Sequence, residues 1–190
     1  SKVVRGGNRV GIYFNEKGAS QRPSICTYDR AHSAISEAKK EDFDWESIFS
    51  GAEWFHFTGI TPALSENVLE ICKEACQVAK KKGVKISCDV NYRSKLWTKE
   101  AAREAMTALS EYIDMIIINE EDAKIVFGIE ADKTDVHTGK LNKEGYEEVA
   151  RKLMEQFRFS EVAITLRESK SASDNDWSGL LYDGKECLFS

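Results

Sequence analysis

The chain has 190 residues, of which 42% are hydrophobic and 31% are charged. This composition is typical of a globular protein with one sizeable core, and no apolar run approaches the ~20 residues that a membrane-spanning helix needs. A formal net charge of −5 argues against a nucleic-acid-binding protein, whose surface would be basic.

The first thirty residues favour a small β structure. Residues 9–14 and 24–30 alternate in polarity with the period of two that is typical of strands. The residues on one face of the first segment are Val10, Ile12 and Phe14. Those on one face of the second are Cys26, Tyr28 and Arg30. Turn-forming residues at 15–18 allow the two strands to pair as a hairpin or to lie in one small sheet.

From residue 54 onward, strands and helices are expected to alternate. Helical apolar spacing predicts helices over residues 65–82, 98–113, 119–127 and 142–157. Apolar runs predict strands over residues 54–58, 84–88, 115–118, 162–166 and 179–182, with one more beginning near residue 185. Thr98 and Asn119 are candidate helix N-caps, and Gly128 is a candidate helix end. This alternation predicts an α/β fold with a parallel sheet buried on both faces.

The two patterns divide the chain into two parts. Residues 1–36 form a small β segment, and residues 37–190 form the α/β body. We expect ligands of this body to bind beyond the carboxyl ends of its strands. The segments that follow the predicted strands, and should converge there, are residues 58–62, 89–93, 119–122 and 165–169. The sequence has neither a P-loop nor a G-x-G-x-x-G motif, which argues against a P-loop enzyme and a nicotinamide-dependent dehydrogenase.

The five cysteines show no metal-site pattern. Their number is odd, no C-x-x-C pair occurs, and none of the three histidines is near a cysteine pair, so no metal site is expected. Cys72 and Cys76 lie four residues apart on the apolar face of a predicted helix, where both should be core residues. Reduced thiols and the lack of a signal-peptide pattern favour the cytoplasm.

Three further motifs follow one another along the chain. They are T-G-I-T-P-A-L at 58–64, D-V-N-Y-R-x-x-L-W at 89–97 and N-E-E-D-A at 119–123. With them the chain resembles 2-keto-3-deoxygluconate kinases of the ribokinase (pfkB) family, and G-I-Y at 11–13 and Y-D-R at 28–30 match that family's β lid. The resemblance implies a three-layer αβα ribokinase-like body with a mostly parallel sheet and a small β lid. It also implies phosphorylation of a sugar-acid hydroxyl, 2-keto-3-deoxygluconate above all, with ATP and Mg²⁺ as cofactors.

The resemblance assigns roles to individual residues. The implied substrate contacts are Tyr13, Tyr28, Arg30 and Arg93. Arg93 is also expected to stabilise the phosphoryl group in transfer. The implied ATP contacts are Asn91, Asn119, Thr165, Arg167 and Ser169. The residues support the lid assignment independently, because a ring and a guanidinium on one strand face can together hold a hydroxylated carboxylate.

Simpler explanations stand beside these roles. Tyr13 and Tyr28 can pack a small sheet or a dimer contact, and Arg93 can form a surface ion pair. Asn119 can cap a helix, with Asp122 at its third position, which is compatible with a place near Mg²⁺ and phosphate. The apolar lid face made by Val10, Ile12 and Phe14 needs cover, so we expect a homodimer joined through the lids.

The chain departs from the family pattern in three places. No G-x-G-D motif, which carries the family's anion hole and catalytic aspartate, occurs in it. We therefore interpret the chain as a central fragment that is inactive alone. Asp122 stands where the family has glutamate, and residues 166–177 contain no glycine where the family's nucleotide turn usually has one. The competing interpretation is a non-catalytic module that binds a sugar acid or a nucleotide.

Overall fold

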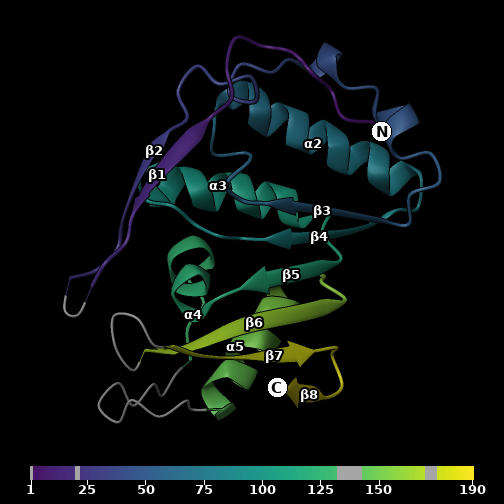
Figure 1. Ribbon diagram of the computed structural model, residues 1–190. Coiled ribbons are helices and arrows are strands. Elements are labelled where there is room, and N and C mark those ends of the chain that lie inside the picture. Colours follow the sequence, from purple (N-terminus) through teal and green to yellow (C-terminus); the bar gives the residue numbers. More distant parts are fainter. Residues whose placement is uncertain (1, 20–21, 132–142, 170–174) are drawn as a thin grey trace.

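The computed structural model describes residues 2–19, 22–131, 143–169 and 175–190, and these form two separate sheets (Figure 1). Strands β1 (Ile12–Glu16) and β2 (Ile25–Asp29) pair antiparallel as a hairpin, one of the two arrangements that the sequence allows, with Tyr13 opposite Tyr28. We call this hairpin the lid. Two short helices, η1 (Lys40–Asp42) and α1 (Trp45–Ile48), connect it to the larger sheet.

The larger sheet has six strands in the order β3-β4-β5-β6-β7-β8. These are β3 (Trp54–Thr58), β4 (Lys85–Asp89), β5 (Met115–Ile118), β6 (Glu161–Ser169), β7 (Asn175–Tyr182) and β8 (Cys187–Phe189). The first four are parallel, and β7 and β8 are added antiparallel. The predicted α/β class, with a mostly parallel sheet and a separate small β sheet, is confirmed.

The helices begin and end where the sequence places its capping residues. The helices are α2 (Glu66–Lys81), α3 (Lys99–Ser110), α4 (Glu120–Asp122), which continues as η2 (Ala123–Phe127), and α5 (Lys143–Gln156). The Thr98 hydroxyl accepts the Ala101 N–H at the start of α3, and the Asn119 amide oxygen accepts the Asp122 N–H at the start of α4. Gly128 ends η2 with a φ of +70°, which favours glycine. All three predicted signals are thereby confirmed.

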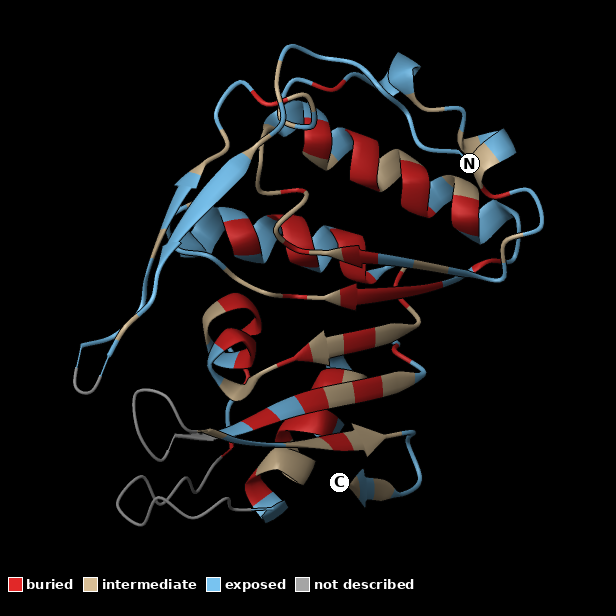
Figure 2. Ribbon diagram, viewed as in Figure 1, coloured by how far each residue is buried: buried red, intermediate tan, exposed pale blue. Residues whose placement is uncertain are grey.

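One face of the sheet carries the core. Alternate strand residues on this face join the buried residues of α2, α3 and α5 in a single cluster that includes Phe57, Cys88, Ile116, Ile164 and Leu180. Figure 2 shows the buried stripe of α2 and of α3 as red bands along each helix. Cys72 and Cys76 lie in this core as predicted, and burial raises the pKa of each thiol to about 12.

The opposite face of the larger sheet contributes a row of residues that lie outside the core. A row of paired residues crosses all six strands there, and none of them belongs to the core cluster: Thr58, Asp89, Ile117, Ala163, Leu181 and Leu188. The expectation of a sheet buried on both faces is therefore wrong for the described residues. The cause is topological. Strands β3 to β6 follow one another in chain order and always step in the same direction, so right-handed crossovers place their helices on one side.

The boundaries of β6 and β7 also differ from the prediction. Both strands are longer than 162–166 and 179–182, because they continue as an antiparallel ladder in which Ser169 lies opposite Asn175. The extension contains polar residues such as Arg167 and Asp176, both exposed, so the apolar pattern stops before the strand does. Among the described residues, no helix is long and apolar enough to cross a membrane, and no group of three or more histidine, cysteine or acidic residues is placed to hold a metal ion.

Candidate functional site

A cavity of about 670 Å³ lies between the lid and the loop that follows β4. The lid contributes β2 and the residues just after it, and the loop contributes residues 93–96. Among the described residues that line the cavity, three carry positive charge, namely Arg30, Arg93 and Lys95, and none is acidic. A protein with a net charge of −5 therefore presents a locally cationic cavity, which suits an anionic ligand.

On the lid side, Tyr28 and Arg30 lie together. The Arg30 guanidinium carbon is 4.2 Å from the centroid of the Tyr28 ring, so the predicted shared face is confirmed. A hydrogen bond with the Cys26 side chain is the main cause of a raised pKa at Tyr28. Tyr13 faces Tyr28 across the hairpin, with ring centroids 6.1 Å apart, but it is 65% exposed and is not part of the cavity lining.

On the body side, the loop after β4 has an unusual backbone. Asn91 has a φ of +42°, a left-handed conformation that asparagine tolerates better than most side chains. Its side-chain amide donates to the Thr58 hydroxyl at 3.3 Å. Gly59 is required beside it, because a Cβ there would collide with the Val90 carbonyl. The turns that carry the T-G and D-V-N-Y-R motifs thus pack against each other at the carboxyl ends of β3 and β4.

Asp122, in the helix α4 that follows β5, binds the same loop. Its Oδ2 accepts the Tyr92 N–H at 3.0 Å, and the carboxylate is almost fully buried. Burial raises the pKa of Asp122, whereas the Tyr92 N–H and the Arg93 charge act in the opposite direction. Burial likewise raises the pKa of Asp89, which also interacts with Arg93. Arg93 itself donates to the Tyr92 carbonyl at 2.8 Å. The charge of Arg93, which lines the cavity, thus interacts with the Asp89 and Asp122 carboxylates, and its guanidinium is bonded to the Tyr92 carbonyl.

The predicted ATP contacts fall into two groups. Asn91 and Asn119 follow neighbouring strands, β4 and β5, at the same edge of the sheet. The segment 165–169, which holds Thr165, Arg167 and Ser169, is predicted to follow a strand, and this is wrong, because all three residues lie within β6. The centre of the predicted nucleotide turn at 166–177, residues 170–174, lies outside the described residues. The Ser169 side chain also lies outside them.

Arg167 has local partners on β7. Its Nε donates to the Asn175 side-chain oxygen at 2.9 Å, and its guanidinium carbon lies 5.5 Å from the centroid of the Trp177 ring. The structure thus brings Tyr28, Arg30 and Arg93 to one cavity, and leaves Tyr13 and Arg167 outside it. Sequence reasoning did not select Lys95, which stands at a variable position of the D-V-N-Y-R-x-x-L-W motif. Its proximity to Arg93 in the chain was the available signal.

Comparison with known proteins identifies relatives of this arrangement. The profile of the pfkB family carbohydrate kinases matches residues 1–167. The crystal structure of 2-dehydro-3-deoxygluconokinase from Thermotoga maritima is 52% identical, with a TM-score of 0.91 over 98% of this chain and 54% of that one. The 2-dehydro-3-deoxygalactonokinase of Haloferax volcanii is 37% identical over 124 residues, which are 65% of this chain and 39% of that protein.

A more distant structure shares the fold. It is a ribokinase II from E. coli in complex with ATP and Mg²⁺, with 16% identity and a TM-score of 0.61 over 88% of this chain and 46% of that one. This chain spans about half the length of these solved structures and 39% of the Haloferax protein.

Proposed function

This chain belongs to the pfkB family of carbohydrate kinases, and from that premise we propose that its parent protein phosphorylates a sugar-acid hydroxyl. The proposed substrate is 2-keto-3-deoxygluconate, and the proposed phosphoryl donor is ATP. The observation that carries this proposal is the cationic cavity between the lid and the loop after β4. It offers two arginines and a lysine to a ligand that brings a carboxylate and meets a phosphoryl group.

The two arginines are assigned different roles. Arg30 lies on the lid, over the Tyr28 ring, and is assigned to the substrate carboxylate. Arg93 lies at the carboxyl end of β4 and is assigned to the transferring phosphoryl group, where a fixed cation stabilises developing negative charge. Tyr13 is assigned to the outer rim of the sugar site. Closure of the lid over the cavity would exclude water and limit ATP hydrolysis.

The nucleotide and its metal are assigned to the adjoining strand ends. Asn91 and Asn119 are the proposed ATP contacts nearest Arg93, and Thr165, Arg167 and Ser169 are proposed along β6. Mg²⁺, when bound with ATP, neutralises phosphate charge. The described residues contain no cluster of acidic side chains able to cage it, so the phosphates would be its main ligands. The catalytic base is assigned to an aspartate of a G-A-G-D-like motif in the rest of the parent protein.

This assignment gives residues 1–36 the role of the lid and residues 37–190 that of part of the α/β body. The remainder of the parent protein would then cover the open sheet face and complete the active site. A chain that folds without that remainder would keep the cavity and lack the base.

The test compares the protein made from the complete reading frame with the 190-residue chain. We expect the complete protein to form ADP from ATP with 2-keto-3-deoxygluconate, and not with ribose, and to add one phosphoryl group to the sugar acid by mass spectrometry. The 190-residue chain should form none. Sugar-acid binding by calorimetry without ADP formation in the complete protein would reject the kinase and favour the non-catalytic binding module.

The lid also supports the proposal of a homodimer. Val10, Ile12 and Phe14 are 78%, 46% and 62% exposed, an unusual amount of apolar surface for one short segment. Ile12→Glu would place a charge in the proposed contact, so the complete protein should change from dimer to monomer by light scattering. Ile35→Glu, at Ile35, which is 42% exposed and lies outside the lid strands and the open sheet face, is the control and should leave the mass unchanged. An unchanged mass for the Ile12 variant would remove the dimer proposal.

A further inference from the structure

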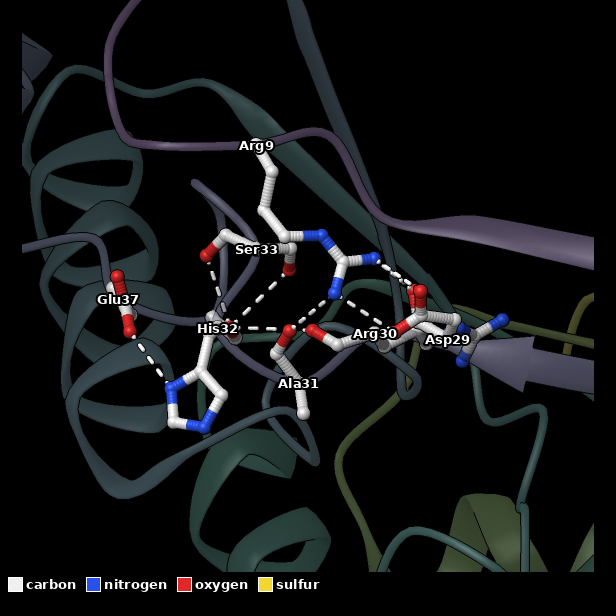
Figure 3. A network of polar contacts seen from close by, with 8 residues as sticks. Arg9, Asp29, Arg30, Ala31, His32, Ser33 and Glu37 are labelled. Carbon is white, nitrogen blue, oxygen red and sulfur yellow. Dashed lines mark hydrogen bonds and ion pairs between the residues drawn. The ribbon is translucent and has the colours of Figure 1, made fainter.

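Arg9, just before β1, makes a concentrated set of contacts with the end of β2 (Figure 3). Its Nη1 donates to Asp29 Oδ1 at 2.8 Å, and its Nη2 lies 2.7 Å from Asp29 Oδ2, so the carboxylate is held by both arms of the guanidinium. The same two nitrogens donate to two backbone carbonyls, that of Ala31 at 2.9 Å and that of Asp29 at 2.9 Å. The planar fork of an arginine makes this four-fold contact possible.

The two carbonyls belong to the residues on either side of Arg30. The Asp29 carbonyl lies in the peptide plane that leads into residue 30, and the Ala31 carbonyl lies in the plane that leads out of residue 31. Holding both carbonyls restrains the backbone between them, and hence the direction of the Arg30 Cα–Cβ bond. Successive strand residues point to opposite faces, so Asp29 turns toward Arg9 while Arg30 turns to the cavity face. There its guanidinium lies over the Tyr28 ring and lines the cavity.

The geometry points to Arg9 as the positioning residue for Arg30: it sets the backbone from which Arg30 reaches a carboxylate-bearing ligand in the cavity. This inference rests on the proposed function, because it assigns Arg30 to the substrate carboxylate. The Arg9 and Asp29 side chains are 34% and 47% exposed, and a partly exposed ion pair adds little to stability. The consequence is therefore expected in ligand affinity and not in unfolding.

Lysine at position 9 keeps the charge and loses the fork. In the complete protein, we expect Arg9→Lys to raise the dissociation constant for 2-keto-3-deoxygluconate about tenfold by calorimetry, since a bidentate guanidinium is not replaced by a point charge. The affinity for the analogue in which the carboxylate is reduced to an alcohol should not change. The melting temperature should stay close to that of the wild type.

Arg22→Lys is the matched control. Arg22 lies in the same hairpin, pairs with the Glu16 carboxylate and donates to the Lys17 carbonyl at 3.2 Å, but it does not line the cavity. Its substitution should leave the affinity for both ligands unchanged. If Arg9→Lys also leaves them unchanged, or weakens the acid and the alcohol equally, the inference is overturned, because Arg9 then has no role or only a general structural one.

A crystal structure of the unliganded Arg9→Lys protein separates this inference from the proposed function. Positioning predicts that the Arg30 guanidinium leaves the Tyr28 ring, over which it lies at 4.2 Å in the wild type. If the wild type binds no sugar acid yet Arg30 moves in the variant, the positioning holds and the proposed substrate is wrong. If Arg30 stays in place, the positioning is wrong, whatever the wild type binds. Asp29→Asn, which keeps one acceptor oxygen, serves if Arg9→Lys does not fold.

Discussion

Replacing Arg93 by alanine in the complete protein should lower kcat for sugar-acid phosphorylation about 10³-fold, the scale of losing one fixed donor to developing charge. The side chain lines the cavity, its guanidinium donates to the Tyr92 carbonyl, and the Tyr92 N–H is held by Asp122. Such a preorganised cation acts more on the transition state than on the bound substrate. The KM for the sugar acid should therefore change much less than kcat, as steady-state kinetics can show.

Two further variants make the Arg93 result specific. Arg93→Lys retains a cation without the planar fork, so its kcat should lie between those of the wild type and the alanine variant. Arg158→Ala removes an equally charged but exposed arginine just before β6 and should behave as the wild type. A kcat within threefold of the wild type for Arg93→Ala would instead support the simple surface ion-pair explanation of Arg93.

Local signals in the sequence predicted the secondary structure well. Thr98, Asn119 and Gly128 act on backbone groups within a few residues, so their effect can be recognised without a tertiary structure. The one-sided packing of the sheet could not be predicted from such signals. It depends on the order in which strands join, and half-buried residues such as Ile117 on the open face are as apolar as those in the core.

The residues of the candidate site could likewise be predicted only in part. The motifs located Arg93 and the lid pair Tyr28 and Arg30, because each stands in a recognisable string or on one strand face. They gave no sign of Arg9, whose contacts join residues about twenty positions apart through backbone carbonyls that carry no sequence information. They also placed residues 165–169 after a strand, which is wrong because the ladder between β6 and β7 extends the strand beyond its apolar part.

Asp122 is the other position where a large effect is expected. Its carboxylate receives the Tyr92 N–H, so Asp122→Ala leaves that donor without its partner and frees the loop that carries Arg93. A displacement of about 1 Å at a catalytic group can cost about 10²-fold in rate, and we expect a loss of kcat of that order. Asp122→Asn keeps an oxygen acceptor for the Tyr92 N–H and should retain kcat within about tenfold of the wild type.

The asparagine variant also distinguishes loop positioning from binding of Mg²⁺ or phosphate. If the charge of Asp122 acted on a metal–nucleotide complex, the asparagine and alanine variants would lose kcat equally. Similar losses in steady-state assays would therefore reject the positioning role. A control at Glu121, which is exposed on the same helix, is Glu121→Gln, and it should leave kcat unchanged.

The stability of the Asp122→Asn protein should depend on pH in a defined direction. Burial raises the pKa of Asp122 in the folded protein above 3.8, its ordinary value, so the folded state holds its proton more tightly than the unfolded chain does. The free energy of unfolding of the wild type then falls as pH rises from 3.8 to the raised folded pKa, and the loss is complete above it. Asparagine does not ionise, so the stability of the Asp122→Asn protein relative to the wild type should increase through that window in urea titrations.

No change of this difference with pH would mean that the Asp122 carboxylate is as well solvated in the folded protein as in the unfolded chain. An increase, together with a retained kcat, would mean that the buried charge itself is dispensable and that the acceptor oxygen beneath the Arg93 loop is what this position supplies.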